Sequence, residues 1–331
     1  MEHNKHKVGL TLGKFAPFHK GHQLLIETAI NEIDELIVLI YDDPVINIPL
    51  STRADWIRKI YPNIKVIEGV NSPNDSGYTA DIMKIQEDYV LSILDNREIS
   101  HFYSSEPYGE HMSLALNAID RQVDLSRNII PISATKIREN SFKHKEFLHP
   151  EVYKDLITKV VLLGAPSTGK TTLAEKLAAH FDTQWMPEYG REYWENHQVN
   201  KRLTLEDLLI IAETHIERED ALVLKSNQIL FSDTNAITTY LFSLDYHGEA
   251  LSALENLAKR AEKRHDIIFV CDTDIPYDDT WDRSGDVKRK EFQEKIIEDL
   301  NTRNLKYYML NGTIAERIEQ VSKVLSAYKK Y

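Results

Sequence analysis

Two histidines lie three residues apart, at positions 19 and 22, in the segment GKFAPFHKGH (residues 13–22). The segment follows a short apolar run, VGLTLG, and precedes an amphipathic run, QLLIETAINEI, so it is predicted to lie where a strand turns into a helix. His19 and His22 beside a helix N-terminus would form a compact anion site, suited to a reaction in which charge builds on phosphate oxygens. Structural histidines and a zinc site are the alternatives. No third His or Cys stands at a standard ligand spacing, which disfavours zinc.

A second segment, ISATKIREN (residues 132–140), carries hydroxyl and basic side chains at what the pattern predicts to be another helix start. Its hydroxyls and main-chain N–H groups would hold a second phosphate group, and its arginine would supply positive charge. The side chains concerned are Ser133, Thr135, Lys136 and Arg138.

The segment GAPSTGKT (residues 164–171) matches the pattern G-x-x-x-x-G-K-[ST] in full, between an apolar strand pattern and a helix pattern. In such a loop the main-chain N–H groups face phosphate oxygens at the N-terminus of a helix. Lys170 would reach the β- and γ-phosphates of ATP, and Thr171 would ligate Mg²⁺. The residues predicted to bind ATP here are Gly164, Ser167, Thr168, Gly169, Lys170, Thr171 and Thr172. A glycine-rich turn without a ligand is the weaker alternative.

Acidic side chains near the ends of two further strand patterns would complete a phosphoryl-transfer site. Asp233 follows the apolar run ILFS and is predicted to hold the metal, the alternative being a cap for the next helix. Glu188 would accept the proton of a substrate hydroxyl, with Arg191 beside it in the substrate cleft. A surface ion pair between Glu188 and Arg191 fits the sequence equally well.

The polar segment DDTWDRSGDVKR (residues 278–289) has the composition of a lid that closes over a triphosphate. Arg283 and Arg289 would then bind ATP and neutralise the transferring charge. A solvated loop is the alternative. No guanine-reading N-K-x-D is present in the sequence, so these parts favour a small-molecule kinase over a GTPase switch.

These residues need a scaffold that brings the ends of parallel strands together. Strand and helix patterns alternate along the chain, which predicts parallel sheets covered by helices. The first half is predicted to have strands at 8–12, 36–41, 64–68 and 100–104 and helices at 20–33, 51–61 and 79–95.

The pattern restarts after residue 158. The second half is predicted to have strands in KVVLLG, TQWMPE, QILFSD and HDIIFVCD, a long helix in TLEDLLIIAETHIEREDALVLKS and a C-terminal amphipathic helix. Two fresh starts predict two domains, residues 1–155 and 156–331, joined near residues 148–158.

Composition narrows the class of protein. The formal net charge of −12 disfavours the chain as a whole as a nucleic-acid binder, although a local phosphate pocket is compatible with it. The single cysteine, Cys271, excludes a disulfide framework and favours a cytoplasmic location. No apolar run approaches the ~20 residues of a membrane span, and no signal peptide is recognisable.

The histidine segment and ISATKIR resemble the H-x-G-H and I-S-x-T-x-x-R signatures of the nucleotidylyltransferase superfamily. Between them, IPLSTRADWI and YSSEPYGE resemble segments of the NadR-type nicotinamide mononucleotide adenylyltransferases, which also carry a C-terminal P-loop ribosylnicotinamide kinase. The resemblance covers nearly the whole chain. It implies a Rossmann-like nucleotidylyltransferase sheet followed by a P-loop kinase sheet.

The resemblance also implies roles for residues of the first domain. His19 and His22 would stabilise the α-phosphate of ATP during its transfer. The other ATP and phosphate contacts would be Gly13, Lys14, Phe15, Gly21, Ser133, Thr135, Lys136 and Arg138. Trp56, Ser105, Glu106 and Tyr108 would lie near the nicotinamide nucleotide.

Together with the P-loop, the resemblance implies a bifunctional enzyme of NAD biosynthesis. Nicotinamide riboside would be phosphorylated with Mg-ATP, and the mononucleotide would then receive AMP from a second ATP, giving NAD and pyrophosphate. Mg²⁺ is the expected cofactor, the partners are these small molecules, and a homo-oligomer is compatible with the sequence. No DNA or membrane partner is expected. Only about seven residues precede the first predicted strand, so the repressor activity of members with an N-terminal helix-turn-helix is not expected.

Three alternatives stay open at this point. The first is an adenylyltransferase for another phosphate ester, such as phosphopantetheine, fused to an unrelated small-molecule kinase. The second is a nucleotide sensor with one inactive half, against which the intact H-x-G-H and the P-loop lysine weigh. A DNA-binding regulator is the weakest, given the net charge.

Overall fold

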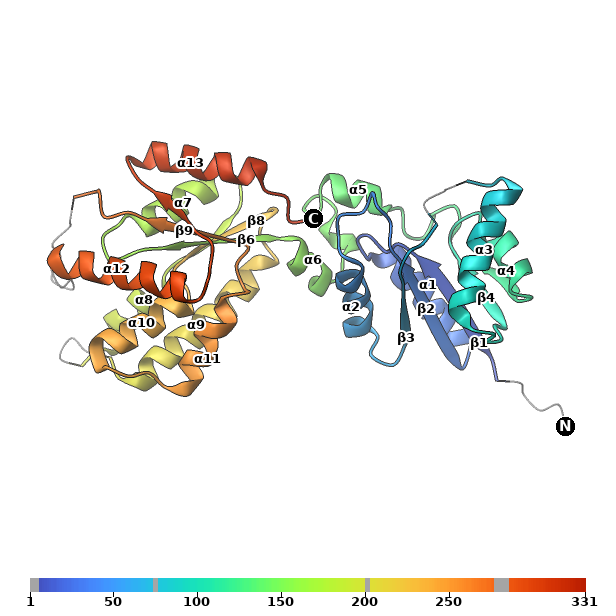
Figure 1. The fold of residues 1–331 in the computed structure, drawn as a ribbon, viewed down its shortest axis with the longest axis horizontal. Coiled ribbons are helices and arrows are strands. Elements are labelled where there is room, and N and C mark those ends of the chain that lie inside the picture. The colour runs from blue at the N-terminus through green and yellow to red at the C-terminus, as the bar shows by residue number, and fades with distance from the viewer. Residues whose placement is uncertain (1–5, 74–76, 200–202, 277–285) are drawn as a thin grey trace. The chain divides into compact units, whose positions relative to one another are not determined.

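The computed structural model describes residues 6–73, 77–199, 203–276 and 286–331. The chain divides into two compact units, one of residues 1–153 with Tyr331 and the other of residues 154–330. Each unit is built on its own five-stranded sheet in which neighbouring strands run parallel (Figure 1). The α/β fold with two separate parallel sheets is therefore confirmed.

The first unit has the strand order β3-β2-β1-β4-β5. Its strands are β1 Val8–Gly13, β2 Glu35–Tyr41, β3 Lys65–Gly69, β4 His101–Ser104 and β5 Ile119–Gln122. Its helices are α1 Lys20–Glu32, α2 Leu50–Ile60, α3 Ala80–Leu94, α4 Gly109–Ala115, α5 Ala134–Glu139 and the 3₁₀ helix Lys145–Phe147, while α6 Pro150–Leu156 crosses into the second unit. The strand order reverses between β1 and β4, and open α/β sheets bind their ligands at such a switch point.

The apolar residues of β1 hold in place the end of the strand from which the histidine segment begins. Leu10 and Leu12 of β1 share one buried cluster with Val90 and Leu94 of α3 and with Met112 of α4. Each such fully buried aliphatic side chain contributes about 1.5–3 kcal/mol relative to exposure. The carboxyl end of β1 is therefore anchored immediately before residue 14, where the predicted site begins.

The second unit has the strand order β10-β9-β6-β8-β7, with the strand that precedes the P-loop at its centre. Its strands are β6 Thr158–Leu163, β7 Gln184–Met186, β8 Ile229–Asp233, β9 Ile267–Cys271 and β10 Tyr308–Leu310. Its helices are α7 Lys170–His180, α8 Tyr189–His197, α9 Leu205–Val223, α10 Ala236–His247, α11 Ser252–Ala261, α12 Asp286–Thr302 and α13 Ile314–Ala327.

Side chains of β6 alternate between two apolar clusters, as the two-residue period of a strand requires. Val161 and Leu163 pack with helices α8 to α12, whereas Val160 and Leu162 pack with α7 and α13. In Figure 1, α7 and α13 lie on one side of the sheet and α8 to α11 on the other. A strand buried on both faces needs apolar residues at successive positions, which is why VVLL has no polar alternation.

Some elements differ from the sequence prediction. TQWMPE forms a strand only over Gln184–Met186, and Glu188 already occupies the N-cap of α8. Strand β5, which the sequence analysis did not predict, has the sequence IDRQ with all four side chains exposed. Such a strand carries no apolar alternation, so its sequence gives no signal. Helices α4 and α11 were not predicted either.

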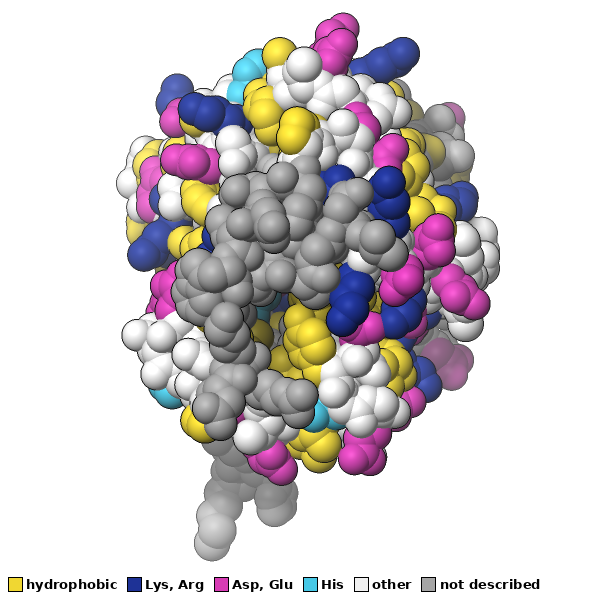
Figure 2. Space-filling view, turned by 90° about the vertical axis from the view of Figure 1, so that its left-hand side faces the viewer, with side chains coloured by type: hydrophobic (Ala, Val, Ile, Leu, Met, Phe, Trp, Pro, Cys, Tyr) yellow, Lys and Arg dark blue, Asp and Glu magenta, His cyan; other side chains and the backbone are white. Residues whose placement is uncertain are grey.

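The surface of the second unit carries charges of both signs. On the face shown in Figure 2, Lys and Arg side chains are interspersed with Asp, Glu and hydrophobic side chains. Within residues 6–73, 77–199, 203–276 and 286–331, no helix is both long and apolar enough to cross a membrane.

A buried polar network joins α9 to β8 and to the loop before β9. The carboxylate of Glu219, 1% exposed, accepts hydrogen bonds from Ser232 and Arg264 and lies 2.8 Å from Nε2 of His265. Burial opposes the charged form, but His265 and Arg264 together hold the pKa of Glu219 well below its usual range. The carboxylate of Glu219 is the acceptor shared by the other three side chains, so the network depends on it.

We expect Glu219→Gln to lower the free energy of unfolding of the second unit by about 3–5 kcal/mol, because one partner of a buried charged network is lost. The matched control is Glu192→Gln, since Glu192 pairs with Arg218 at 2.7 Å while both side chains are exposed. Such surface pairs contribute about 0–1 kcal/mol. Urea unfolding followed by circular dichroism measures both changes, and equal losses would contradict the assignment.

Candidate active sites

The histidine pair caps helix α1 through its own ring nitrogens. Nδ1 of His19, the N-cap residue, accepts the N–H of Gly21 at 3.1 Å, and Nδ1 of His22 accepts the N–H of His19 at 3.2 Å. Both Nδ1 atoms are thus acceptors, so in the neutral rings both protons reside on Nε2. The rings stack with their centroids 3.7 Å apart. The pair therefore presents two Nε2–H donors, fixed in direction by the helix cap.

Both histidines are held in the neutral form. Burial, and then the charge of Arg127, lowers the pKa of His19 to about 4. Burial, His19 and Arg127 lower the pKa of His22 well below its ordinary value. Two stacked imidazolium rings would also repel each other. At neutral pH the pair consequently acts as two uncharged hydrogen-bond donors.

Small and aromatic neighbours keep the rings in place. A Cβ added at Gly21 would lie 3.0 and 3.1 Å from two atoms of the His19 ring, so a larger residue would displace that ring. The ring of Phe15 meets His22 edge-on at 4.9 Å between centroids, and Phe18 stacks on it at 5.8 Å. Phe15 itself is buried, with its backbone at φ +47°. Gly13 ends β1 directly against the Phe15 ring.

The second sequence motif meets the first. The guanidinium of Arg138 donates to the carbonyl of Ala16, and at 3.2 Å to Oγ1 of Thr135. Ser133 caps α5 by accepting the N–H of Lys136 at 3.4 Å. Residues 13–22 and 133–138 thus lie at one place, as the motifs predict, with the side chains of Thr135 and Lys136 exposed beside it.

A buried arginine that sequence reasoning missed supports the same loop. Arg53 of α2, 1% exposed, donates to the carbonyls of Lys14, Tyr41 (3.1 Å) and Ile48 (2.9 Å). The ammonium group of Lys14 pairs with Asp43. Arg53 lies within the segment IPLSTRADWI. That segment therefore stabilises the loop after β1 through the bond from Arg53 to the carbonyl of Lys14.

Trp56 of the same segment was predicted to lie near the nicotinamide nucleotide. Its side chain is fully buried, so it presents no face to a ligand in this structure. Helix α2 turns Trp56 into the core along with Ile57, so a position near the nucleotide stays a prediction and the buried ring itself lines no surface.

The loop after β4 lies across the switch point from β1. The hydroxyl of Tyr108 donates to the carbonyl of Leu12 at 3.0 Å, and the half-buried Ser105 and Glu106 precede it. Glu106 pairs at 2.9 Å with Arg127, the cation whose charge acts on both histidines.

Arg127 is a further residue that the sequence analysis did not identify. Its loop is shaped by the carboxylate of Asp124, which accepts the N–H groups of Asn128, Ile129 and Ile130 at 2.8–3.0 Å. Asp followed by residues in a tight turn is a recognisable signal, although nothing in it indicates the neighbouring histidines.

In the second unit the P-loop wraps the start of α7. A Cβ at Gly164, where φ is +141°, would lie 2.7 Å from the carbonyl of Cys271, and Gly169 at φ +79° is the N-cap residue. Lys170 donates from Nζ to the carbonyl of Ala165 at 2.9 Å, and Thr168 donates to the same carbonyl at 2.8 Å. Cys271 is fully buried, which raises the pKa of its thiol to about 11.

Thr171 and Asp233 meet at the predicted metal position. Oγ1 of Thr171 lies 2.5 Å from Oδ2 of Asp233, and Oδ1 of this buried carboxylate has no hydrogen-bond partner among the described residues. Burial, and then the nearby Glu188, raises the pKa of Asp233 to about 6. The alternative role as a helix cap is wrong, because Asn235 caps α10 by accepting the N–H of Ile237 at 3.0 Å.

A divalent cation fits this donor set. The unpartnered Oδ1 of Asp233 is a buried oxygen that water or a cation would satisfy. A single carboxylate beside a hydroxyl is a donor set that suits Mg²⁺, which is commonly bound by one or two carboxylates, waters and substrate phosphates.

Glu188 lies close enough to Asp233 to raise its pKa, and Arg191 acts on the same carboxylate in the opposite sense. No ion pair joins Glu188 to Arg191 in the described chain; instead Glu192 pairs with Arg218. Another acidic residue, Asp182, precedes β7 at the opposite end of the parallel strands from the P-loop, so it is remote from the site and cannot replace Glu188 as the proton acceptor.

The predicted lid residues have different outcomes. Arg283 lies outside the described residues. Arg289 is in helix α12 rather than a loop, is 5% exposed, and donates to the carbonyls of Thr273 (2.9 Å), Ile275 (3.2 Å) and Ser167 (3.4 Å). The prediction that Arg289 belongs to a polar loop closing over ATP is therefore wrong, because its guanidinium is buried and bound to main-chain carbonyls of the P-loop and of the segment after β9. Thr172 is exposed in the first turn of α7.

Each unit of the chain matches a known protein family in sequence. Residues 10–140 match the cytidylyltransferase-like family and residues 159–317 match a family of AAA domains. The trifunctional NAD biosynthesis/regulator protein NadR of Salmonella typhimurium is 29% identical over 329 residues, covering 91% of this chain and 78% of its own.

Two crystal structures of NadR proteins, one in complex with NAD and AMP-PNP and one in complex with NR, cover 98% of this chain and 97% of their own. Each has a TM-score of 0.58 and 24% sequence identity, a likeness of fold.

Fold, motifs and matches define a two-domain nucleotide-binding protein in which a cytidylyltransferase-like domain precedes an AAA-type P-loop domain. Over nearly its whole length the chain is similar in sequence to NadR proteins of Salmonella typhimurium and Escherichia coli.

We expect both histidines to stay neutral at pH values where an ordinary imidazole is half protonated. Their folded pKa values lie below the unfolded value of about 6.5. Below that pH the unfolded chain therefore takes up protons that the folded one does not, and the first unit loses stability as pH falls toward 4. Two-dimensional ¹H–¹⁵N spectra of the histidine rings report protonation and tautomer. Titration of His19 near pH 6.5, or a proton on Nδ1, would contradict the cap geometry.

Proposed function

We propose that this chain is a bifunctional enzyme of NAD biosynthesis. Residues 156–331 phosphorylate the 5′-hydroxyl of nicotinamide riboside with ATP. Residues 1–155 then join the mononucleotide to AMP from a second ATP, releasing pyrophosphate. The observation that supports the proposal is that one chain carries two separate strand-to-helix loops with phosphate-binding motifs, each at the carboxyl edge of its own parallel sheet.

In the kinase half, Lys170 and the P-loop N–H groups hold the triphosphate of ATP. Thr171 and Asp233 would hold Mg²⁺, which when bound neutralises charge on the phosphate oxygens. Glu188 accepts the proton of the riboside hydroxyl, and Arg191 lies beside the same carboxylate cluster. Transfer is in line and needs positioning and charge rather than a protein nucleophile.

In the adenylyltransferase half, the mononucleotide phosphate attacks the α-phosphorus of ATP in line. The two Nε2–H groups of His19 and His22 donate to the oxygens on which negative charge grows. Because the rings are neutral, they stabilise that charge as preoriented dipoles. Further contacts to the phosphates are assigned to the half-buried Ser133 and to the exposed side chains around the two motifs, Lys14, Thr135, Lys136 and Arg138. Gly13, Phe15 and Gly21 shape the loop.

The choice of nicotinamide substrates rests on the relatives. The Salmonella typhimurium protein is named for NAD biosynthesis, and the two crystal structures are of complexes with NAD and AMP-PNP and with NR. Ser105, Glu106 and Tyr108, across the switch point, are the side chains assigned to the nicotinamide nucleotide. The enzyme would act in the cytoplasm on freely diffusing small molecules.

The direct test is synthesis of NAD from ATP, Mg²⁺ and nicotinamide riboside. We expect Lys170→Ala to abolish riboside phosphorylation while adenylyl transfer to supplied mononucleotide continues. His22→Ala should do the reverse, with a loss of about 10²–10³ in turnover, the usual effect of removing one donor to a developing oxyanion.

Each variant is the control for the other, since each leaves one half intact. Mixing them should restore NAD synthesis after a lag, because the mononucleotide must first accumulate in solution. NAD formed at normal rate from mononucleotide by His22→Ala would refute the role of the histidines. Turnover of phosphopantetheine in place of the mononucleotide would favour the alternative adenylyltransferase.

Glu188→Gln tests the proton acceptor. The substitution preserves size but removes basicity, so riboside phosphorylation should fall by about 10²–10⁴ with little change in ATP affinity. Glu192→Gln, one turn along α8, is the matched control and should leave the rate unchanged. Steady-state kinetics with varied ATP and riboside measures both, and a normal rate for Glu188→Gln would exclude it as the base.

A further inference from the structure

Arg317 is a fully buried arginine that no motif indicated. It lies in the first turn of α13, 0% exposed, and its guanidinium is surrounded by main-chain carbonyls. It donates from Nη1 to the carbonyl of Thr168 at 2.7 Å, from Nε to that of Gly312 at 3.1 Å and from Nη2 to that of Asp272 at 3.3 Å. Its charge is paired with the carboxylate of Asp274.

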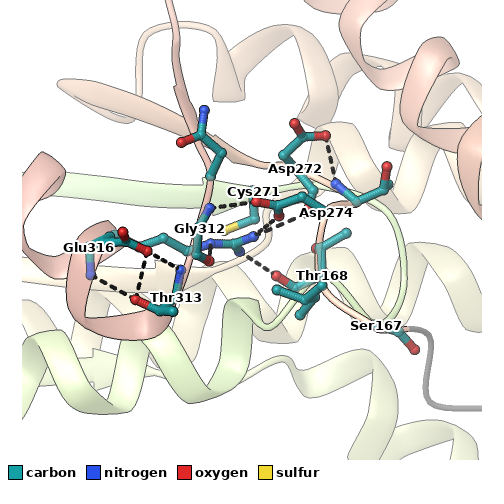
Figure 3. Close-up of polar contacts among 12 residues, drawn as sticks. Ser167, Thr168, Cys271, Asp272, Asp274, Gly312, Thr313 and Glu316 are labelled. Atoms are coloured by element: carbon teal, nitrogen blue, oxygen red, sulfur yellow. Dashed lines mark hydrogen bonds and ion pairs between the residues drawn. The ribbon is translucent and has the colours of Figure 1, made fainter.

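These contacts join three loops at the carboxyl edge of the second sheet. Thr168 belongs to the P-loop after β6, Asp272 and Asp274 follow β9, and Gly312 follows β10. Figure 3 shows Thr168, Asp272, Asp274 and Gly312 converging on one point, with Thr313 and Glu316 of the adjoining helix cap beside them. The N–H of Gly312 also donates to Asp274, so the carboxylate holds the loop and the guanidinium together.

The bond to Thr168 has a consequence for the face of the P-loop that binds phosphate. In a trans peptide the C=O and the following N–H point in opposite directions. Holding the carbonyl of Thr168 toward Arg317 therefore turns the N–H of Gly169 the other way. Gly169, at φ +79°, has no side chain to restrict its backbone, so an external contact has to set this orientation.

The same carbonyl-binding mode recurs at the neighbouring residue. Arg289 of α12 donates to the carbonyl of Ser167, so two arginines from two helices hold successive carbonyls of the loop. Burying a charged guanidinium away from water costs free energy unless its N–H groups are hydrogen-bonded within the protein. Such a side chain is unlike the exposed Lys136 and Arg191, which remain open to solvent.

We propose that Arg317 is a positioning residue for ATP in the kinase half. It sets the direction of the Gly169 N–H and locks the P-loop to the loops after β9 and β10. It makes no contact with phosphate itself. This inference rests on the proposed nucleotide-dependent function of the P-loop, but not on nicotinamide riboside being the acceptor.

The test compares Arg317→Lys and Arg317→Met with the parent full-length protein. Losing a charged, buried hydrogen bond corresponds to about 10- to 100-fold in an equilibrium. We expect the KM for ATP in phosphorylation, and the dissociation constant of a fluorescent ATP analogue at the P-loop, to rise by about that factor in Arg317→Met. The P-loop component of analogue binding is the part lost in Lys170→Ala.

Arg317→Lys separates positioning from charge. Lysine keeps the positive charge but cannot span three carbonyls, so ATP affinity should still fall, by less than in Arg317→Met. Arg303→Met is the matched control, because the side chain of Arg303, the residue that follows α12, is mostly buried and pairs with Glu262 and Asp299 at 2.7 Å, away from the P-loop. It should lower the melting temperature without changing the KM for ATP.

Adenylyl transfer by the same preparations, carried by the other unit, should stay within about twofold of the parent. Wild-type ATP affinity in a folded Arg317→Met, or full rescue by lysine, would overturn the positioning role. So would failure of both Arg317 variants to fold, since that would make the residue purely structural. If the parent bound the analogue but phosphorylated a different acceptor, the proposed substrate would be wrong while the role of Arg317 would stand.

Discussion

The orientation of a few main-chain amides governs both candidate sites. A loop between a strand and a helix binds phosphate only when its N–H groups face inward, which requires its carbonyls to be held on the outside. Arginines do this in both units: Arg53 and Arg138 hold the carbonyls of Lys14 and Ala16, and Arg317 holds that of Thr168. A guanidinium suits the task because its planar fork of donors reaches several carbonyls at once.

The two candidate sites offer different groups for the stabilisation of phosphate charge. The second unit uses a buried ammonium group, Lys170, beside a carboxylate that fits a cation. The first uses two neutral imidazoles whose direction is fixed by reciprocal capping of α1. Positive charge around it is supplied by exposed side chains such as Arg127. Neutral donors avoid the repulsion that two stacked cations would suffer. The rings of His19 and His22 can therefore stack closely because their low pKa values keep both of them neutral.

The sequence predicted most of the framework and the principal motifs. Runs such as VVLL and LIVLI are long enough to specify strands buried on both faces, and H-x-G-H and the P-loop are local patterns with fixed geometry. Three arginines were missed because their partners are distant in the sequence. Arg53 binds the carbonyl of Lys14, 39 residues away, and Arg317 binds that of Thr168, 149 residues away. Arg127 pairs with the side chain of Glu106, which the fold brings close to it. The burial of Trp56 and of Arg289 was not predicted for the same reason, since composition cannot tell which way a helix turns its side chains.

The single cysteine of the chain has a practical consequence. Cys271 is enclosed beside the P-loop, and its thiol, with a pKa raised to about 11, is almost entirely protonated under ordinary conditions. Thiol-directed reagents need an accessible thiolate, so the native chain should be nearly silent to maleimide chemistry. A cysteine introduced at an exposed position could then carry a fluorophore or spin label selectively, without replacing a residue that packs against Gly164. Pairs of such labels, one in each unit, would make distances between the two nucleotide sites measurable during turnover.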